Sequence, residues 1–397
     1  MNHKQKKFFL FLLIILSCIT AGFVLLRQPP VVTLANRVLA SCSTTAYRST
    51  CYEREIPKLM NHITMEEAFA VTKIVQDKDP EFLYCHVLAH EISFRESAKN
   101  PSNWKDVVDR CPVAMCNYGC LHGSLVQHFR GTDVLTEAQL EEVLPDLRTV
   151  CEPRKGFSPS EIDRSMCYHA LGHLAMYISG GKPDRSLTIC QNVVPNPDTR
   201  EFMETCAGGV FMTIFQGIDP EDIALVKDIK PQKIQVPEFC SRYGAYTRQC
   251  RQESFALFRD EIATPAGYMT FCSFAQTPKE IEDCTFIVVN DVTVRVLSEP
   301  DGIDSLTSYC LGVVQDRQEL CFAGIAMRMV QIEPLRYVRE AQDFCKIAKQ
   351  HGVGDRCFEG VIFYAAFSFP KGSANWRRYC NGLQNPWKTQ CFTKEGI

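Results

Sequence analysis

The cysteines of this chain recur at an interval that few folds can accommodate. The 397-residue sequence contains 21 cysteines, and ten of them follow one another at steps of 34 to 47 residues, most of them 34 to 39. These ten are Cys51, Cys85, Cys120, Cys167, Cys206, Cys250, Cys284, Cys321, Cys357 and Cys391. Such a period is typical of solenoids, in which each unit buries its apolar face only against neighbouring units.

The residues around these cysteines indicate that the repeated unit is helical. Apolar residues follow the cysteines at helical spacing, as at Val210, Phe211, Ile214 and Phe215. A small residue, which permits close approach of a neighbouring backbone, often stands three positions after the cysteine. Examples are Gly123, Ala170, Gly209, Gly324 and Gly360. We therefore expect an all-α array of helical hairpins, either an α-solenoid or a closed α/α superhelix.

The N-terminus predicts export of this array from the cytoplasm. Three lysines precede an uncharged apolar run over residues 8–26, which would span roughly 28 Å as a helix, close to the hydrocarbon thickness of a bilayer. The lysines favour a cytoplasmic position for residues 1–7. We expect residues 8–26 to be a transmembrane anchor, residues 27–40 a linker, and residues 41–397 an extracytoplasmic, disulfide-rich helical repeat domain.

Two alternatives to the membrane anchor are open. The segment Ile15-Leu16-Ser17-Cys18 is similar to a bacterial lipobox, in which Cys18 would be lipidated. Simple cleavage near Ala21-Gly22 is the second alternative. All three interpretations place the body of the protein outside the cytoplasm, in a periplasm or at a cell surface.

An exported body with an even number of cysteines implies a disulfide framework. Without Cys18, 20 cysteines remain, and 18 of them form couples separated by 9 to 16 positions. Cys85 and Cys116 are left over, and we pair them with each other, although the spacing leaves this assignment open. The couples are Cys42/Cys51, Cys111/Cys120, Cys151/Cys167, Cys190/Cys206, Cys240/Cys250, Cys272/Cys284, Cys310/Cys321, Cys345/Cys357 and Cys380/Cys391.

Two segments show the repeated pattern most fully. They read FCKIAKQHGVGDRCFEGVIF over residues 344–363 and YCLGVVQDRQELCFAGIAM over residues 309–327. This pattern of an aromatic-cysteine pair followed by Cys-Phe-x-Gly resembles the disulfide-linked helical repeats of cysteine-rich Sel-like proteins, which are related to tetratricopeptide arrays. The resemblance covers unit length and the cysteine couple across most of the body. It implies an α-solenoid and transfers no functional residue.

Histidines supply the candidate functional site. Six of the nine histidines lie between residues 85 and 173, and two pairs, His86/His90 and His169/His173, have H-x3-H spacing. This spacing places both imidazoles of a pair one turn apart on the same helix face, where they can share a metal ion. His122 follows its cysteine by two residues, as His169 does, so we expect it to be a fifth or replacement ligand.

Imidazole ligands suit zinc, copper and iron, and the sequence does not choose among these metals. Glu91 follows His90 directly and could act as a catalytic general base, a ligand or an orienting group. His128 should lie on another face or near a helix end. The alternative is that the histidines are structural, because H-x3-H alone is common and a duplicated helix carries its histidines along.

The function predicted from these features is metal binding or metal-dependent catalysis by a membrane-anchored, extracytoplasmic repeat protein. The sequence leaves open whether the protein is an enzyme. A non-enzymatic scaffold that binds an envelope protein, a peptide or a glycan is the alternative, because solenoids present extended surfaces. The net charge of -3 gives no reason to expect a nucleic-acid partner.

Overall fold

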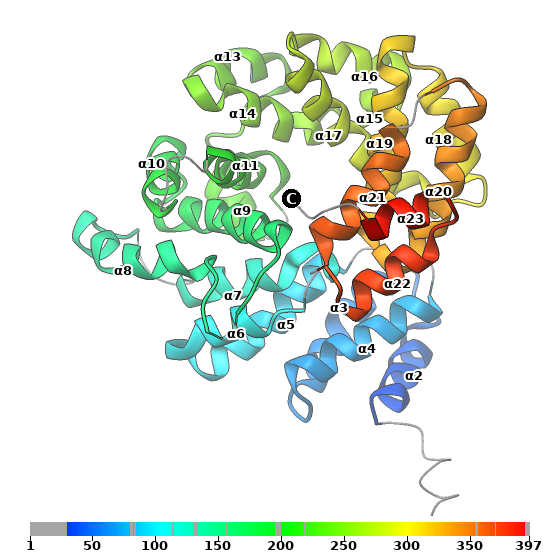
Figure 1. The fold of residues 1–397 in the computed structure, drawn as a ribbon. Helices are drawn as coiled ribbons and strands as arrows, with labels where there is room; N and C mark the ends of the chain where they lie inside the picture. The colour runs from blue at the N-terminus through cyan, green and yellow to red at the C-terminus, as the bar shows by residue number, and fades with distance from the viewer. Residues whose placement is uncertain are drawn as a thin grey trace, which may run out of the picture. The chain divides into compact units, whose positions relative to one another are not determined.

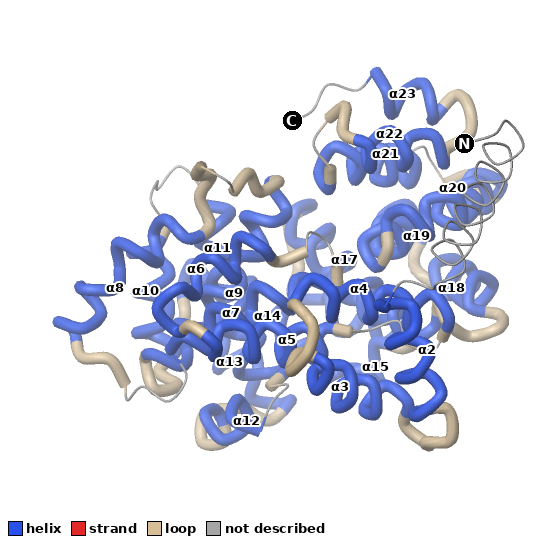
Figure 2. The backbone as a smooth tube through the Cα atoms, turned by 90° about the horizontal axis from the view of Figure 1, so that it is seen from below, coloured by secondary structure: helices blue, strands red, loops and turns tan. Residues whose placement is uncertain are grey.

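The computed structural model describes residues 30–79, 82, 85–112, 115–129, 134–155, 157–194, 200–217, 220–353, 356–369 and 371–393. Apart from an isolated bridge between Arg154 and Phe157, these residues form helices, turns and loops without a strand (Figure 2). The predicted all-α fold is therefore confirmed. Among the described helices none is both long and apolar enough to cross a bilayer. The predicted anchor at 8–26 and Cys18 lie outside the described residues.

The chain divides into two compact units, residues 1–82 and residues 83–397. In the first unit, residues 30–40, which we expected to be a linker, form most of the first described helix. The buried residues Ala35, Val38 and Cys42 explain this, because their spacing places them on one helix face. The helices of this unit are α2 (Pro30–Cys42), α3 (Arg48–Leu59) and α4 (Met65–Lys78).

The second unit contains the remaining described helices, most of which form hairpins with the next helix along the chain. Its first part comprises α5 (His86–Lys99), α6 (Trp104–Arg110), α7 (Gly119–Phe129), α8 (Glu137–Val150), α9 (Glu161–Ile178), α10 (Pro183–Val193), α11 (Arg200–Gln216) and α12 (Pro220–Val226). Its second part comprises α13 (Val236–Ser241), α14 (Thr247–Glu253), α15 (Arg259–Ile262), α16 (Pro265–Phe271), α17 (Pro278–Val296), α18 (Gly302–Leu311), α19 (Gln315–Ile332), α20 (Pro334–Gln350), α21 (Arg356–Ser368), α22 (Ala374–Gly382) and α23 (Trp387–Thr393).

One helix from each hairpin of the second unit belongs to a continuous row. The row runs α5, α7, α9, α11, α14, α17, α19 and α21, and each helix contacts the next (Figure 1). The last helices of the row also contact its first part, since α21 contacts α9 and α19 contacts the short 3₁₀ turn Cys116–Tyr118 that precedes α7. Residues that are distant in sequence, such as those of α5, α7 and α9, therefore come together through stacking of successive units.

All ten proposed couples are disulfides. Nine of them join one helix, at or near its C-terminal end, to the helix that follows. The pairing of Cys85 with Cys116 is also confirmed, and it differs from the others because it joins the start of α5 to the turn that precedes α7. This bridge thus connects two successive helices of the row.

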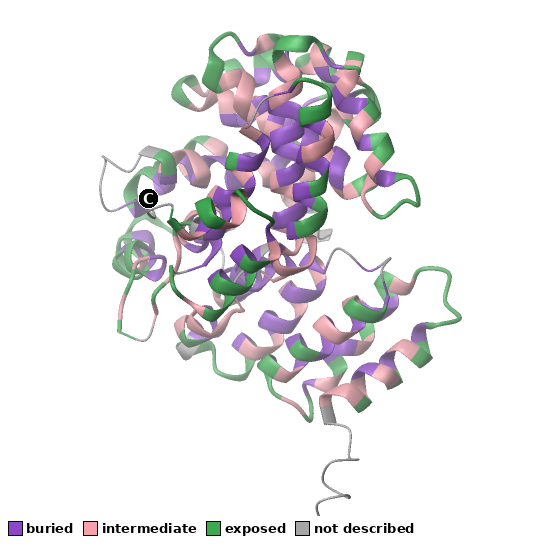
Figure 3. Ribbon diagram, turned by 45° about the vertical axis from the view of Figure 1, so that its right-hand side comes forward, coloured by how far each residue is buried: buried purple, intermediate pink, exposed green. Residues whose placement is uncertain are grey.

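Local sequence explains where several helices begin. Thr64, Thr136, Ser160 and Thr277 each form a capping box with the third residue of the following helix, which satisfies backbone donors at the helix start. The apolar faces of the helices are buried against their neighbours, and exposed positions lie on the turns and outer faces (Figure 3). The capping box at Ser160 is the one that starts α9, the helix that carries His169 and His173.

Candidate metal centre

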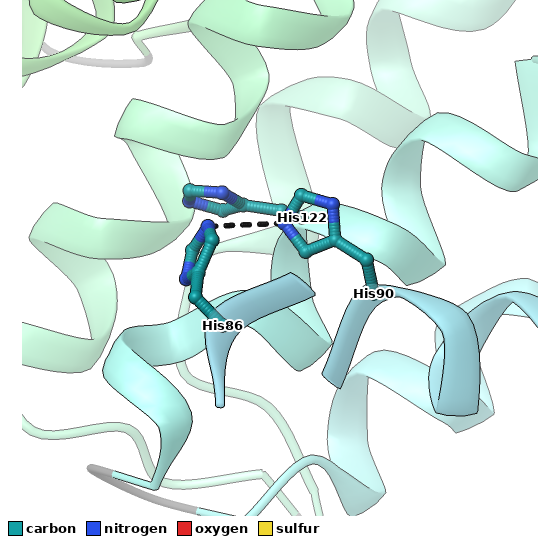
Figure 4. Close-up of side chains that lie close together, drawn as sticks. All are labelled: His86, His90 and His122. Carbon is teal, nitrogen blue, oxygen red and sulfur yellow. Dashed lines mark hydrogen bonds between the residues drawn. The ribbon is translucent and has the colours of Figure 1, made fainter. Parts of the chain in front are cut away.

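Helix α5 presents the first histidine pair to α7. His86 opens α5 and His90 follows one turn later, and their Nε2 atoms lie 3.0 Å apart. His122 of α7 packs against this pair, with its ring centroid 4.8 Å from that of His86 (Figure 4). His86 and His122 are buried and His90 is partly buried. These three residues are called the first triad below.

Helix α9 presents the second histidine pair to His122 as well. His169 and His173 also lie one turn apart, and their Nε2 atoms are separated by 3.2 Å. The ring centroid of His122 is 5.7 Å from that of His169 and 5.0 Å from that of His173. His122, His169 and His173 are called the second triad. His122 therefore belongs to both triads, at the centre of the cluster rather than at its edge.

The distances within the cluster suit a transition metal. In each triad one ring nitrogen from every histidine lies within 4.8 Å of the other two. Two nitrogens bound tetrahedrally at about 2.0 Å from a zinc-sized ion would lie about 3.3 Å apart. The separations of 3.0 Å and 3.2 Å within the pairs are close to this value.

Hydrogen bonds to Nδ1 fix the tautomer of two histidines. His86 Nδ1 lies 3.1 Å from the carbonyl oxygen of Cys116, which can only accept, so Nδ1 carries the proton. His173 Nδ1 lies 2.9 Å from the hydroxyl oxygen of Thr213. That hydroxyl donates its own proton to the carbonyl of Gly209 and therefore accepts from His173. In both rings the lone pair is left on Nε2, which faces the partner histidine.

Each of these lone pairs requires a cation or a donated proton opposite it. The partner ring, His90 or His169, can supply a proton from its own Nε2, or both nitrogens can bind one metal ion. His122 Nε2 is buried and has no hydrogen-bond partner among the described residues. A buried polar atom without a partner costs about 1–3 kcal/mol, and a metal bound by either triad would remove that cost.

Burial favours the neutral form of His122, His169 and His173 by lowering the pKa of each. It lowers the pKa of His122 and of His173 well below the ordinary value, and the neighbouring histidines lower both pKa values further. Burial also lowers the pKa of His169 to about 4, against the opposing effect of a hydrogen bond to the Thr205 backbone. Neutral imidazole is the form that binds metal.

Two other residues singled out in the sequence lie apart from this arrangement. The carboxylate of Glu91 accepts from the guanidinium of Arg95 at 2.8 Å on the same helix, and its catalytic role stays a prediction. His128, expected on another face or near a helix end, stacks on Trp104 with a centroid distance of 5.0 Å in the last turn of α7.

The structure adds three residues that sequence reasoning missed. Met212 and Thr213 of α11 contact His169 and His173, with the Met212 Sδ atom 3.2 Å from His169 Nε2. The repeat itself offered a sequence signal for Met212, because this residue occupies the same place in its unit as a candidate ligand does in the preceding unit. Met212 stands six residues after Cys206, the place that His173 holds after Cys167.

Glu253 is the third missed residue, and it lies at a pocket beside His169. The pocket has a volume of about 530 Å³, and Glu201, Glu204 and Gly208 are also among its lining residues. The amide of Gln216 donates to the Glu253 carboxyl at 2.7 Å. Burial of this carboxyl raises the pKa of Glu253 to about 8.

In comparisons with known proteins, no family model, curated protein or solved structure matches the chain. The resemblance to cysteine-rich Sel-like repeats is supported at the level of architecture, as an all-helical array with a disulfide within each couple.

Proposed function

We propose that this protein binds a transition metal through the five-histidine cluster, in an oxidising compartment outside the cytoplasm. The proposal rests on the Nε2 atoms of His86 and His173, whose lone pairs are fixed by the hydrogen bonds at Nδ1 of the same rings. Each of these atoms lies within 3.2 Å of the Nε2 atom of the partner histidine. A hydrogen-bond acceptor at Nδ1 is the usual means by which proteins orient metal-binding imidazoles.

The disulfides support the compartment and restrict the ligands. Disulfides form and persist in oxidising environments. All twenty cysteines within the described residues are disulfide-bonded, so none of them offers a thiolate. Imidazole nitrogen is consequently the principal donor at the site. We retain the anchor at residues 8–26 as part of the proposal, with the repeat domain on the extracytoplasmic side of the membrane.

Elemental analysis tests the proposal directly. Protein would be purified from an oxidising compartment, incubated with metal, freed of excess ions and measured for bound metal per chain. We expect about one ion per chain in the wild type, because both triads share His122. His122→Phe, which keeps a ring but removes its nitrogens, and the double variant His86→Ala/His169→Ala should lose most of the metal.

His128→Ala is the matched control, because His128 lies on α7 with His122 but outside both triads. It should retain the metal content of the wild type. A wild-type protein with all ten disulfides and no bound metal would contradict the proposal, and so would full metal content in both the His122→Phe protein and the double variant.

The pocket at His169 favours a second candidate function, metal-dependent catalysis. A small molecule in this pocket would reach a ligand of the second triad, with the Glu253 carboxyl also lining the space. An open coordination position is the requirement for such chemistry. Addition of azide to the cobalt-substituted protein tests it: a change in the visible spectrum supports an open position, whereas an unchanged spectrum favours metal storage or a structural ion.

A further inference from the structure

A thioether sulfur lies within the second triad. Met212 Sδ is 3.2 Å from His169 Nε2, and that nitrogen is in turn 3.2 Å from His173 Nε2. The sulfur therefore lies against the nitrogen that a metal in the second triad would bind. Met212 is held there by α11, which packs closely against α9.

A glycine allows α9 and α11 to pack closely. Gly209 stands so near the His169 carbonyl that an added Cβ would lie 2.0 Å from that oxygen. Three residues further along α11, Met212 is placed beside the same histidine. The next residue, Thr213, accepts from His173 Nδ1. One face of α11 thus carries both the group that orients His173 and a sulfur at the metal-binding edge of His169.

Sulfur changes the metal preference of a histidine site. Thioether is a soft, uncharged donor that favours copper(I), whereas imidazole alone suits zinc, copper, iron and nickel. A thioether is also only a weak hydrogen-bond acceptor, so a hydrogen bond from His169 would gain little from this contact. With its cysteines oxidised, the chain has in Met212 a soft donor that remains available in an oxidising compartment.

We infer that the second triad is a copper site in which Met212 is a ligand together with His169, His173 and His122. This inference rests on the proposed metal-binding function and specifies its metal. Two imidazoles fixed one turn apart, a third from α7 and a thioether from α11 give a four-donor set of the kind that holds copper(I).

Competition titrations of the full-length protein test the inference. Copper(I), supplied as its acetonitrile complex so that no thiol reductant attacks the disulfides, would be titrated against bicinchoninate. Zinc would be titrated against a chromophoric chelator. Met212→Leu, which keeps the apolar volume, should weaken copper(I) binding by about tenfold or more, while zinc affinity stays within about twofold.

Met203→Leu is the matched control, because Met203 is a partly buried methionine on the same helix. It should change neither affinity. X-ray absorption of the copper-loaded wild type gives a readout that is independent of any variant: a sulfur scatterer at about 2.3 Å is expected, and it should disappear in Met212→Leu. Far-ultraviolet circular dichroism and non-reducing mass mapping would confirm that each protein is folded with ten disulfides.

Equal copper(I) affinity in the wild type and Met212→Leu, or a copper spectrum without a sulfur scatterer, would overturn the copper assignment. The metal-binding function would stand in that case if His122→Phe still abolished zinc binding. A wild type that binds neither metal would remove both the function and the inference.

Discussion

Thr213 illustrates how a single hydroxyl can determine the behaviour of the cluster. It accepts from His173 Nδ1 and donates to the Gly209 carbonyl, so its own hydrogen bonds leave His173 with one tautomer. Without this acceptor the ring could rotate or place its proton on Nε2. The metal-binding nitrogen would then be blocked in a fraction of molecules.

Thr213→Val should therefore weaken metal binding by about 10- to 100-fold, the usual effect of losing an orienting partner. Competition titration measures this effect. Thr205→Val on the same helix is the control, because the Thr205 hydroxyl donates to the Glu201 carbonyl at 2.8 Å rather than to a histidine. Equal losses in the two variants would show that the hydroxyl of Thr213 has no specific role.

Glu253 should make stability depend on pH. Its pKa is raised to about 8 by burial, so between about pH 4.5 and 8 the folded state holds a proton that the unfolded state has released. The free energy of unfolding should accordingly fall as pH rises through this range, by at most about 1.4 kcal/mol per pH unit. Glu253→Gln should reduce that slope.

Urea unfolding of the metal-free protein at pH 5, 6, 7 and 8 would measure the slope. The variant should gain stability relative to the wild type as pH rises, with little difference near pH 5. A parallel pH dependence in the two proteins would show that the Glu253 carboxyl titrates normally.

At the scale of helices, glycines set the distances on which the cluster depends. An added Cβ at Gly123 would lie 2.5 Å from the His90 carbonyl oxygen, and one at Gly209 would lie 2.0 Å from that of His169. The α5–α7 and α9–α11 contacts thus bring backbone against backbone at the turns that carry histidines. A side chain at either glycine would push its helix away from the site.

Gly209→Ala should destabilise the protein by about 1–3 kcal/mol, since the overlap is with backbone that cannot rotate away, and it should also reduce metal affinity. Gly208→Ala is a stringent control, because the neighbouring position leaves the new Cβ at 3.6 Å from its closest atoms. Urea unfolding and metal titration of both proteins would test the difference. Equal stability in the two proteins would contradict close backbone packing at Gly209.

At the scale of the whole molecule, the bridge between Cys85 and Cys116 closes the longest disulfide loop, with a sequence separation of 31. The same bridge also lies beside the first triad. The carbonyl of Cys116 accepts from His86 Nδ1, and Cys85 immediately precedes His86. Loss of this bridge should therefore affect both stability and the first triad.

Replacing both cysteines by alanine should cost about 3–4 kcal/mol by the loop-closure relation and weaken metal binding. The terminal bridge between Cys380 and Cys391 provides the comparison, with a separation of 11. Its removal should cost about 3 kcal/mol and leave metal affinity unchanged. Thermal unfolding together with metal titration would distinguish the two variants, and unchanged metal affinity in both would contradict the role given to the Cys116 carbonyl.

Much of this organisation could be predicted from the sequence because it repeats. The spacing of the cysteines predicted the helical units and nine of the bridges, and the tenth, between Cys85 and Cys116, followed only because these two cysteines were left over. The H-x3-H pairs and the shared Cys-x-His place of His122 and His169 indicated residues that do come together. For Met212 the repeat register offered a signal, but neither its contact with His169 nor that of Thr213 with His173 could be predicted, because these pairs are 43 and 40 residues apart. Glu253 could not be predicted either, because it lines a pocket with a histidine 84 residues before it.

The position of His122 has a mechanical consequence for the array. Among the ten disulfides of the described residues, none joins α7 to α9, and the histidines meet at that junction. An ion held by His122 and the α9 pair would act as a removable crosslink between neighbouring hairpins, adding about 4 kcal/mol when its free concentration is a thousand times Kd. Chelation would then loosen the contact between α7 and α9, a junction between hairpins that no disulfide of the described residues crosses.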